Sequence, residues 1–207
     1  MRIIKKIQTR RGENLNINGE AEKIISRTPS SKTFALKPDD FFGTFPKLLK
    51  KEGQEIKAGE PVFFSKNDPR IKFVSPVSGI IQSIERGPRR KIEKIIIANS
   101  LVDDSISHKV DNWEKLNRDE LITLLLESGN WPFIHQRPYG TIANPDETPK
   151  AIFISAHRTS PLCPDFEFIL NKEIKAFQDG ILILNKLVDQ QVFLSLIHIS
   201  EPTRQSP

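Results

Sequence analysis

Short apolar runs separated by turn residues characterise the first half of the 207-residue chain. Each run holds only a few, mostly apolar residues, and Gly, Pro or an Asn-Asp pair interrupts the runs at short intervals. This spacing is typical of small β-barrels and sandwiches, whose short strands are joined by tight turns. It predicts strands around residues 3–4, 61–64, 71–74, 79–81 and 95–97.

The hydrophobic period changes to that of a helix after residue 117. Asn117 and Glu120 form an imperfect capping box, in which each side chain can accept a hydrogen bond from the other residue's backbone. An apolar stripe occupies residues 121–126, and Gly129 supplies a stop signal. Together these signals predict a helix over 118–128.

A strand and a further helix are predicted beyond this point. Residues 151–155, Ala-Ile-Phe-Ile-Ser, indicate a short strand that is buried on both faces. Pro164 opens the next predicted helix and Gly180 ends it. The run 181–188 is too continuously apolar for its period to decide between helix and strand, and we interpret it as helix. A strand followed by a helix favours an α/β unit.

The chain is therefore predicted to hold two domains, one β-rich over residues 1–110 and one α/β over 111–194. Residues 195–207 resemble translated sequencing-adapter DNA, so we expect a non-native tail that truncates the second domain. A divergent natural terminus is the alternative.

Two segments of the first half carry a more specific pattern. Residues 52–62 and 75–84 resemble the interlocking segments of biotinyl and lipoyl domains, which fold as a barrel-sandwich hybrid. A carrier domain of that kind bears its cofactor on a lysine at an exposed hairpin tip, and Lys66 lies near that position. The methionines that flank a carrier lysine are missing here, so Lys66 is either an ordinary turn lysine or, in an alternative interpretation, the carrier residue.

Composition excludes several other classes of protein. The chain is 37% apolar and 28% charged, which is typical of a soluble globular protein and not of a disordered one. No apolar stretch approaches the roughly 20 residues that span a bilayer. The single Cys163 cannot form an internal disulfide or a thiolate metal site alone. The four histidines, His108, His135, His157 and His198, lack the spacing of a metal site, so no metal is predicted. No nucleophile motif occurs either, and we predict no catalytic residue.

Charge is distributed unevenly along the chain. Residues 1–100 hold 21 Lys and Arg against 11 Asp and Glu, whereas the remainder is acidic. Such asymmetry indicates either two surfaces for two neighbours, for example an anionic membrane face or an acidic partner, or an ordinary solvated surface. A nucleic-acid binder is the weakest interpretation because no aromatic residues interleave with the cations around Arg86 to Arg90.

Several motifs occur in an order that is similar to one family. The sequence resembles the large soluble A-type subunit of the sodium-translocating NADH:quinone oxidoreductases (Na⁺-NQR) through residues 12–19, 75–79, 86–90, 127–131, 137–139 and 177–180. The resemblance implies a peripheral subunit on the cytoplasmic face of the inner membrane, in a complex that couples NADH oxidation and quinone reduction to Na⁺ export. It also implies neighbouring subunits, chiefly the membrane-embedded B-type subunit, and NADH, flavin and iron-sulfur sites on those other subunits.

The same resemblance also implies a fold for the second domain, and a related family is the alternative. It implies a Rossmann-like α/β fold, related to the flavoprotein subunit of respiratory complex I, that has lost its cofactor site. Consistent with this, no glycine-rich loop follows residues 152–155. The related C-type subunit of Rnf electron-transport complexes is an alternative, but it would need that loop and downstream cysteine clusters.

Two stretches are implied to bind quinone, residues 36–43 and 133–141. An aromatic slot with a donor for a carbonyl oxygen suits a quinone ring. The alternative is that the Phe41-Phe42 pair belongs to the core or an interface and that Arg137 pairs with an acidic neighbour. The candidate residues are Leu36, Phe41, Phe42, Gly43, Phe133, His135, Arg137, Pro138 and Tyr139.

Overall fold

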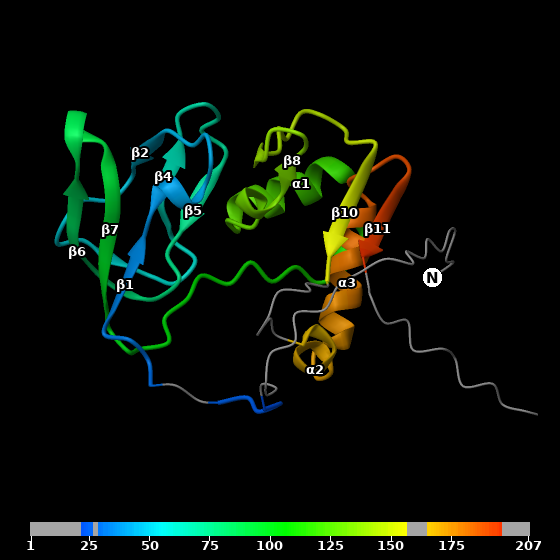
Figure 1. The fold of residues 1–207 in the computed structure, drawn as a ribbon, viewed down its shortest axis with the longest axis horizontal. Helices are drawn as coiled ribbons and strands as arrows, with labels where there is room; N and C mark the ends of the chain where they lie inside the picture. Colours follow the sequence, from blue (N-terminus) through cyan, green and yellow to red (C-terminus); the bar gives the residue numbers. More distant parts are fainter. Residues whose placement is uncertain (1–21, 27–28, 157–164, 196–207) are drawn as a thin grey trace, which may run out of the picture.

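The computed structural model describes residues 22–26, 29–156 and 165–195 (Figure 1). Two antiparallel sheets form the first unit. One has the strand order β1-β7-β6-β3 and the other the order β2-β4-β5. The strands are β1 (Thr33–Leu36), β2 (Pro46–Leu48), β3 (Glu55–Ile56), β4 (Pro61–Ser65), β5 (Lys72–Val74), β6 (Gly79–Arg86) and β7 (Ile92–Asn99).

The two sheets pack on a shared apolar core. Val62, Phe63, Ile81, Ile95 and Ile97 are fully buried within it. The predicted strands at 61–64, 71–74, 79–81 and 95–97 are confirmed, whereas residues 3–4 lie outside the described residues. Short 3₁₀ turns complete the connections: η1 (Pro38–Asp40), η2 (Pro88–Arg90), η3 (Trp113–Lys115) and η4 (Trp131–Phe133).

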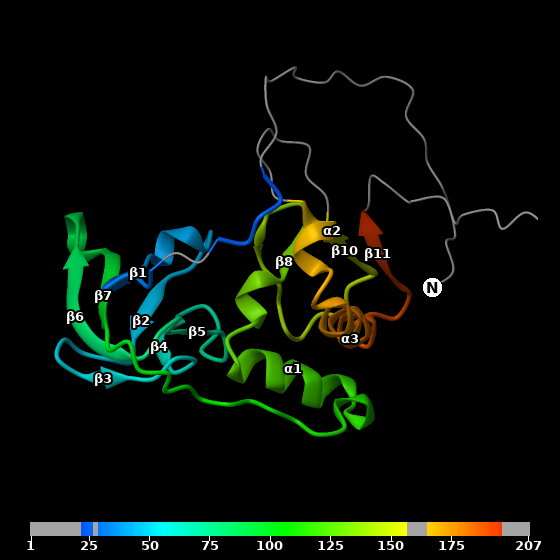
Figure 2. The same ribbon diagram turned by 90° about the horizontal axis from the view of Figure 1, so that it is seen from below.

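The second unit lies at the other end of the molecule, where Figures 1 and 2 both place the helices. Its strands β10 and β11 pair in parallel, with two helices in the connection between them. A short antiparallel pair, β8 and β9, precedes this sheet. The elements are α1 (Arg118–Glu127), β8 (His135–Gln136), β9 (Thr141–Ile142), β10 (Ala151–Ser155), α2 (Phe166–Leu170), α3 (Ile174–Asn185) and β11 (Gln191–Ser195).

The predicted helix at 118–128 is confirmed as α1, and its capping box is complete. The Asn117 side chain accepts a hydrogen bond from the Glu120 backbone N–H at 3.0 Å. The Glu120 carboxylate accepts one from the Asn117 N–H at 2.8 Å. Leu121, Ile122 and Leu126 are buried on the face toward the core, so capping and an apolar stripe together explain the helix.

The cap gives a direct test of this local assignment. Replacing Asn117 with alanine is expected to lower the free energy of unfolding by about 1 kcal/mol, because the first turn loses a partner for a free N–H. Urea denaturation followed by circular dichroism measures the change. Asn171→Ala, at the exposed end of α2, is the control. Equal stability losses in the two variants would contradict the capping role.

The expectation that residues 151–155 are buried on both faces is wrong. Ile152 packs against the core, but Phe153 is 77% exposed. Phe153 and Phe193 stack on the opposite face of the sheet, with ring centroids 5.0 Å apart. In the described residues β10 pairs with β11 alone and the helices cover one face, so the other face stays open.

Helix boundaries in this unit also differ from the prediction. The helix over this region is broken into α2 and α3, and Gly180 lies inside α3 instead of ending it. A glycine within a helix costs only about 1 kcal/mol, which the continuing apolar stripe offsets. Asp165 caps α2 by accepting from two backbone N–H groups, whereas Pro164 lies outside the described residues. The helical interpretation of 181–188 holds through Asn185.

Candidate functional site

The two candidate stretches are positioned by different units. Leu36 ends β1, and the buried Pro38 begins the turn η1. Phe41 directly follows this turn and packs against the core. The second stretch follows α1. Gly129, with φ at +72°, turns the chain into η4, and the β8–β9 hairpin comes next.

A chain of aromatic contacts joins the two stretches. Phe63 and Phe73 stack with ring centroids 4.4 Å apart, and Phe73 and Phe41 meet edge to face with centroids 4.6 Å apart. Phe41 then meets Phe133 at 6.0 Å, again with an edge-to-face geometry. Such pairs add to the stability that burial of the rings provides. Residues almost a hundred positions apart are thereby brought into contact.

Gly43 is the second point of contact. Its φ of +76° lies in the left-handed region, and a Cβ there would lie 3.2 Å from the Thr141 Cγ2 atom. The chain at Gly43 therefore approaches β9 more closely than most side chains would allow. The loop after η1 and the β8–β9 hairpin lie side by side for this reason.

The remaining candidate residues are spread between core and surface. Leu36 is half-buried and packs against the core, so it contributes little accessible surface. Phe42, Phe133 and Tyr139 are 70%, 72% and 73% exposed. His135, Arg137 and Pro138 are exposed as well. The structure thus assembles an open aromatic surface at the junction of the two units and not an enclosed slot.

A cavity of about 1190 Å³ adjoins this surface. Phe133, His135, Arg137 and Tyr139 line it, together with residues of β10, β11 and α3. The residues of the first stretch, 36–43, lie outside its lining. Only the second candidate stretch therefore opens into the cavity, while the first reaches it through the contact of Phe41 with Phe133.

Lys66 lies at the tip of the hairpin between β4 and β5, with an exposed side chain. Its backbone N–H donates to the Phe45 carbonyl at 2.8 Å, and the Asn67 side-chain amide donates to the Gly43 carbonyl at 3.2 Å. A carrier lysine needs a hairpin tip that is free to move. These contacts favour the turn-lysine interpretation over the carrier one.

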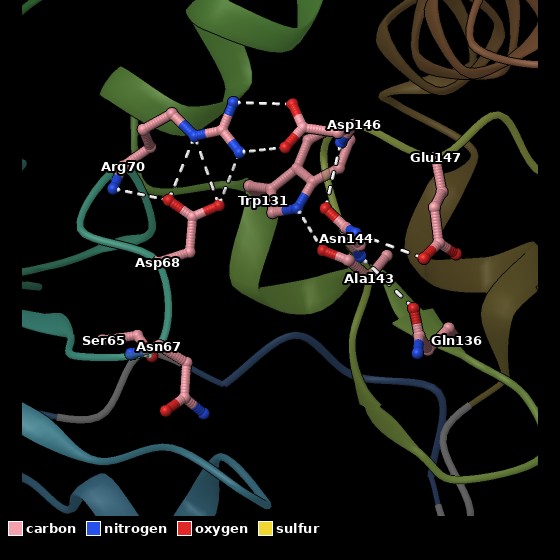
Figure 3. A network of polar contacts seen from close by, with 10 residues as sticks. All are labelled: Ser65, Asn67, Asp68, Arg70, Trp131, Gln136, Ala143, Asn144, Asp146 and Glu147. Carbon is pink, nitrogen blue, oxygen red and sulfur yellow. Dashed lines mark hydrogen bonds and ion pairs between the residues drawn. The ribbon is translucent and has the colours of Figure 1, made fainter.

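A polar network that the sequence did not reveal lies beside the same hairpin (Figure 3). The Arg70 guanidinium contacts Asp68 within the hairpin and Asp146 of the second unit, both at 2.7 Å from Nη2. Hydrogen bonds from Arg70 hold the pKa values of both carboxyl groups below their usual range. No sequence signal marked the pair, because its members are 76 positions apart.

The described residues contain no group of three or more His, Cys, Asp or Glu that could hold a metal ion. His108 and His135 are both described but belong to different segments, while Cys163, His157 and His198 lie outside the described residues. Most of the loop that follows β10, residues 157–164, also lies outside the described residues.

None of the described helices is both long and apolar enough to cross a membrane.

Comparison with known protein families matches both units. The model of the NqrA N-terminal barrel-sandwich hybrid domain matches residues 7–100, and that of the NqrA second alpha/beta domain matches residues 116–205. The chain belongs to the NqrA family. The predicted fold class, a barrel-sandwich domain followed by an α/β domain, is confirmed.

Curated relatives of the NqrA family agree with the domain match. The protein of Tolumonas auensis is 32% identical over 191 residues, which are 91% of this chain and 43% of the relative. That of Serratia proteamaculans is 33% identical over 190 residues, 90% of this chain and 42% of the relative. Both are named as the A-type subunit of a Na(+)-translocating NADH-quinone reductase. The chain therefore spans less than half the length of these relatives.

The domain boundaries stay predictions. The family models leave residues 101–115 between them, a segment that includes the predicted boundary near residue 111. The second model also extends to residue 205, into the segment 195–207 that we predict to be a non-native tail.

Proposed function

We propose that this chain is the N-terminal part of the A-type subunit of a membrane complex that couples NADH oxidation and quinone reduction to Na⁺ export. The names of the relatives support this role. The chain acts only within the complex, on the cytoplasmic face of the inner membrane, and docks on neighbouring subunits, chiefly the membrane-embedded B-type subunit. NADH, flavins and iron-sulfur centres are bound by those other subunits, and no residue of this chain makes or breaks a bond.

Within that complex the junction of the two units binds a quinone. The observation that carries this proposal is the contact of Phe41 with Phe133, which brings the two candidate stretches together. A quinone ring can pack against these phenylalanines, and Arg137 or His135 can donate to a carbonyl oxygen at the cavity rim. Apolar surface with a few polar groups is the usual character of such sites.

The exposure of the site supports a docking role as well. Binding sites for small molecules usually bury about 70–90% of their ligand, whereas Phe42, Phe133 and Tyr139 leave most of their surface open. A neighbouring protein of the complex closes the pocket, and the exposed aromatic side chains are the anchors at that contact, because aromatic residues dominate the energetics of interfaces.

Titration of the 207-residue chain with ubiquinone-1 tests the proposal. Phe133→Ala and Arg137→Gln are each expected to weaken binding about tenfold, because they remove a ring contact and a charged donor respectively. Arg89→Gln is the control, since Arg89 is an exposed arginine between β6 and β7 that does not line the cavity. Isothermal calorimetry measures the dissociation constants. Unchanged affinity in both junction variants, or an equal loss in the control, would refute quinone binding at the junction.

A further inference from the structure

Arg70 joins the two units through a forked contact. Its Nη1 donates to Asp146 Oδ1 at 2.8 Å and its Nη2 donates to Asp146 Oδ2 at 2.7 Å. The Nε and Nη2 atoms also donate to Asp68 in the same hairpin. Two carboxylates thus hold one planar guanidinium, so both the position and the orientation of the contact are fixed.

The Asp146 loop is in turn tied to the second candidate stretch (Figure 3). The Asp146 N–H donates to the Asn144 side chain at 3.1 Å, and the Asn144 N–H donates to the Gln136 side chain in β8 at 3.3 Å. The Trp131 indole N–H donates to the Ala143 carbonyl at 2.8 Å. Gln136 lies between the candidate residues His135 and Arg137. A shift of Asp146 would therefore also shift the surface that lines the cavity.

The hairpin that bears Arg70 also supports the first stretch. Phe73 of β5 contacts Phe41, and the Asn67 side chain donates to the Gly43 carbonyl. Arg70 therefore lies in the hairpin that supports the first stretch, and its partner Asp146 lies in the loop that supports the second stretch.

We propose that Arg70 is a positioning residue that sets the alignment of the two stretches at the junction, a role that rests on the proposed quinone function. Its side chain is 48% exposed and that of Asp146 is 69% exposed. Exposed ion pairs add little to stability. Loss of Arg70 consequently disturbs the alignment of the site more than it destabilises the fold.

The test compares Arg70→Gln, Asp146→Asn and their combination with Lys57→Gln in the 207-residue chain. Lys57 is a matched control because it forms an exposed ion pair with Asp104 at 3.1 Å, away from the junction. We expect each junction variant to raise the dissociation constant for ubiquinone-1 about fivefold, and the double variant to raise it no further, because both changes break one contact. Arg70→Lys keeps the charge but not the fork, and we expect it to resemble Arg70→Gln.

Amide hydrogen exchange supplies a second readout that does not require quinone. Exchange is expected to accelerate at residues 133–146 in Arg70→Gln and to stay unchanged in β6 and β7, with all variants fully folded by circular dichroism. Unchanged exchange at 133–146 would overturn the positioning role, and so would wild-type affinity in Arg70→Gln or full rescue by lysine. If the parent chain binds no ubiquinone-1 without the neighbouring subunits, the affinity comparison has no reference value and the exchange experiment alone decides the role of Arg70.

Discussion

Replacing Phe73 with alanine is expected to lower the free energy of unfolding by about 3–5 kcal/mol. The Phe73 side chain is 3% exposed and contacts both Phe63 and Phe41. Truncation would remove two ring contacts and leave a cavity that the neighbouring strands cannot fill completely. Because Phe41 loses its support, the contact with Phe133 at the candidate quinone site is expected to loosen as well.

Urea denaturation measured by circular dichroism and by tryptophan fluorescence quantifies this loss. Phe193→Ala is the control, since Phe193 is 44% exposed and stacks on Phe153 outside the core. The control is expected to lose about 1 kcal/mol or less. Phe73→Leu, which retains most of the buried volume, remains measurable if the alanine variant does not fold. A loss for Phe73→Ala no larger than that of the control would show that the ring is not a structural support of the site.

Replacing Gly129 with alanine is expected to lower the free energy of unfolding by about 2–4 kcal/mol, from two additive causes. The φ of +72° is unfavourable for a residue with a Cβ. In addition, that Cβ would lie 2.5 Å from the Val74 Cγ1 atom, so β5 and the turn after α1 would have to separate. The loss of stability therefore has two parts: the strain of a positive φ at alanine, and the loss of packing between the two units.

A second glycine separates the two causes. Gly140 has a φ of +73°, but a Cβ there would meet nothing within 4 Å. Gly140→Ala therefore reports the conformational cost alone, about 1–2 kcal/mol. The double variant Gly129→Ala/Val74→Ala is expected to lose less than the sum of its single variants, since the smaller side chain makes room. Equal losses in Gly129→Ala and Gly140→Ala would contradict the contact with Val74.

The sequence predicted those elements whose signals are local. The helix at α1 follows from a cap at Asn117, an apolar stripe and a glycine stop, all within a few turns of chain. The strands β4 to β7 follow from short apolar runs and the turn residues between them. The misplaced helix end at Gly180 has the opposite explanation, because a weak local stop was outweighed by packing along α3.

The family resemblance named the two candidate stretches, and it gave no arrangement for them. The sequence predicted one aromatic slot that includes Phe41 and Phe133, and the folded chain places their ring centroids 6.0 Å apart beside an open surface. It expected a strand buried on both faces at β10, whereas Phe153 lies on an open face. It gave no sign of the Arg70–Asp146 contact.

The sequence by itself determined the local elements, the order of the two domains and the family, because caps, turns and hydrophobic periods act over a few residues. Only the tertiary structure decided that the β4–β5 hairpin joins both candidate stretches and that the junction is open. Those features depend on contacts between residues such as Arg70 and Asp146, 76 positions apart. Contacts of that kind form only when the whole chain packs, because burial and loop closure, rather than local preference, bring the two partners together.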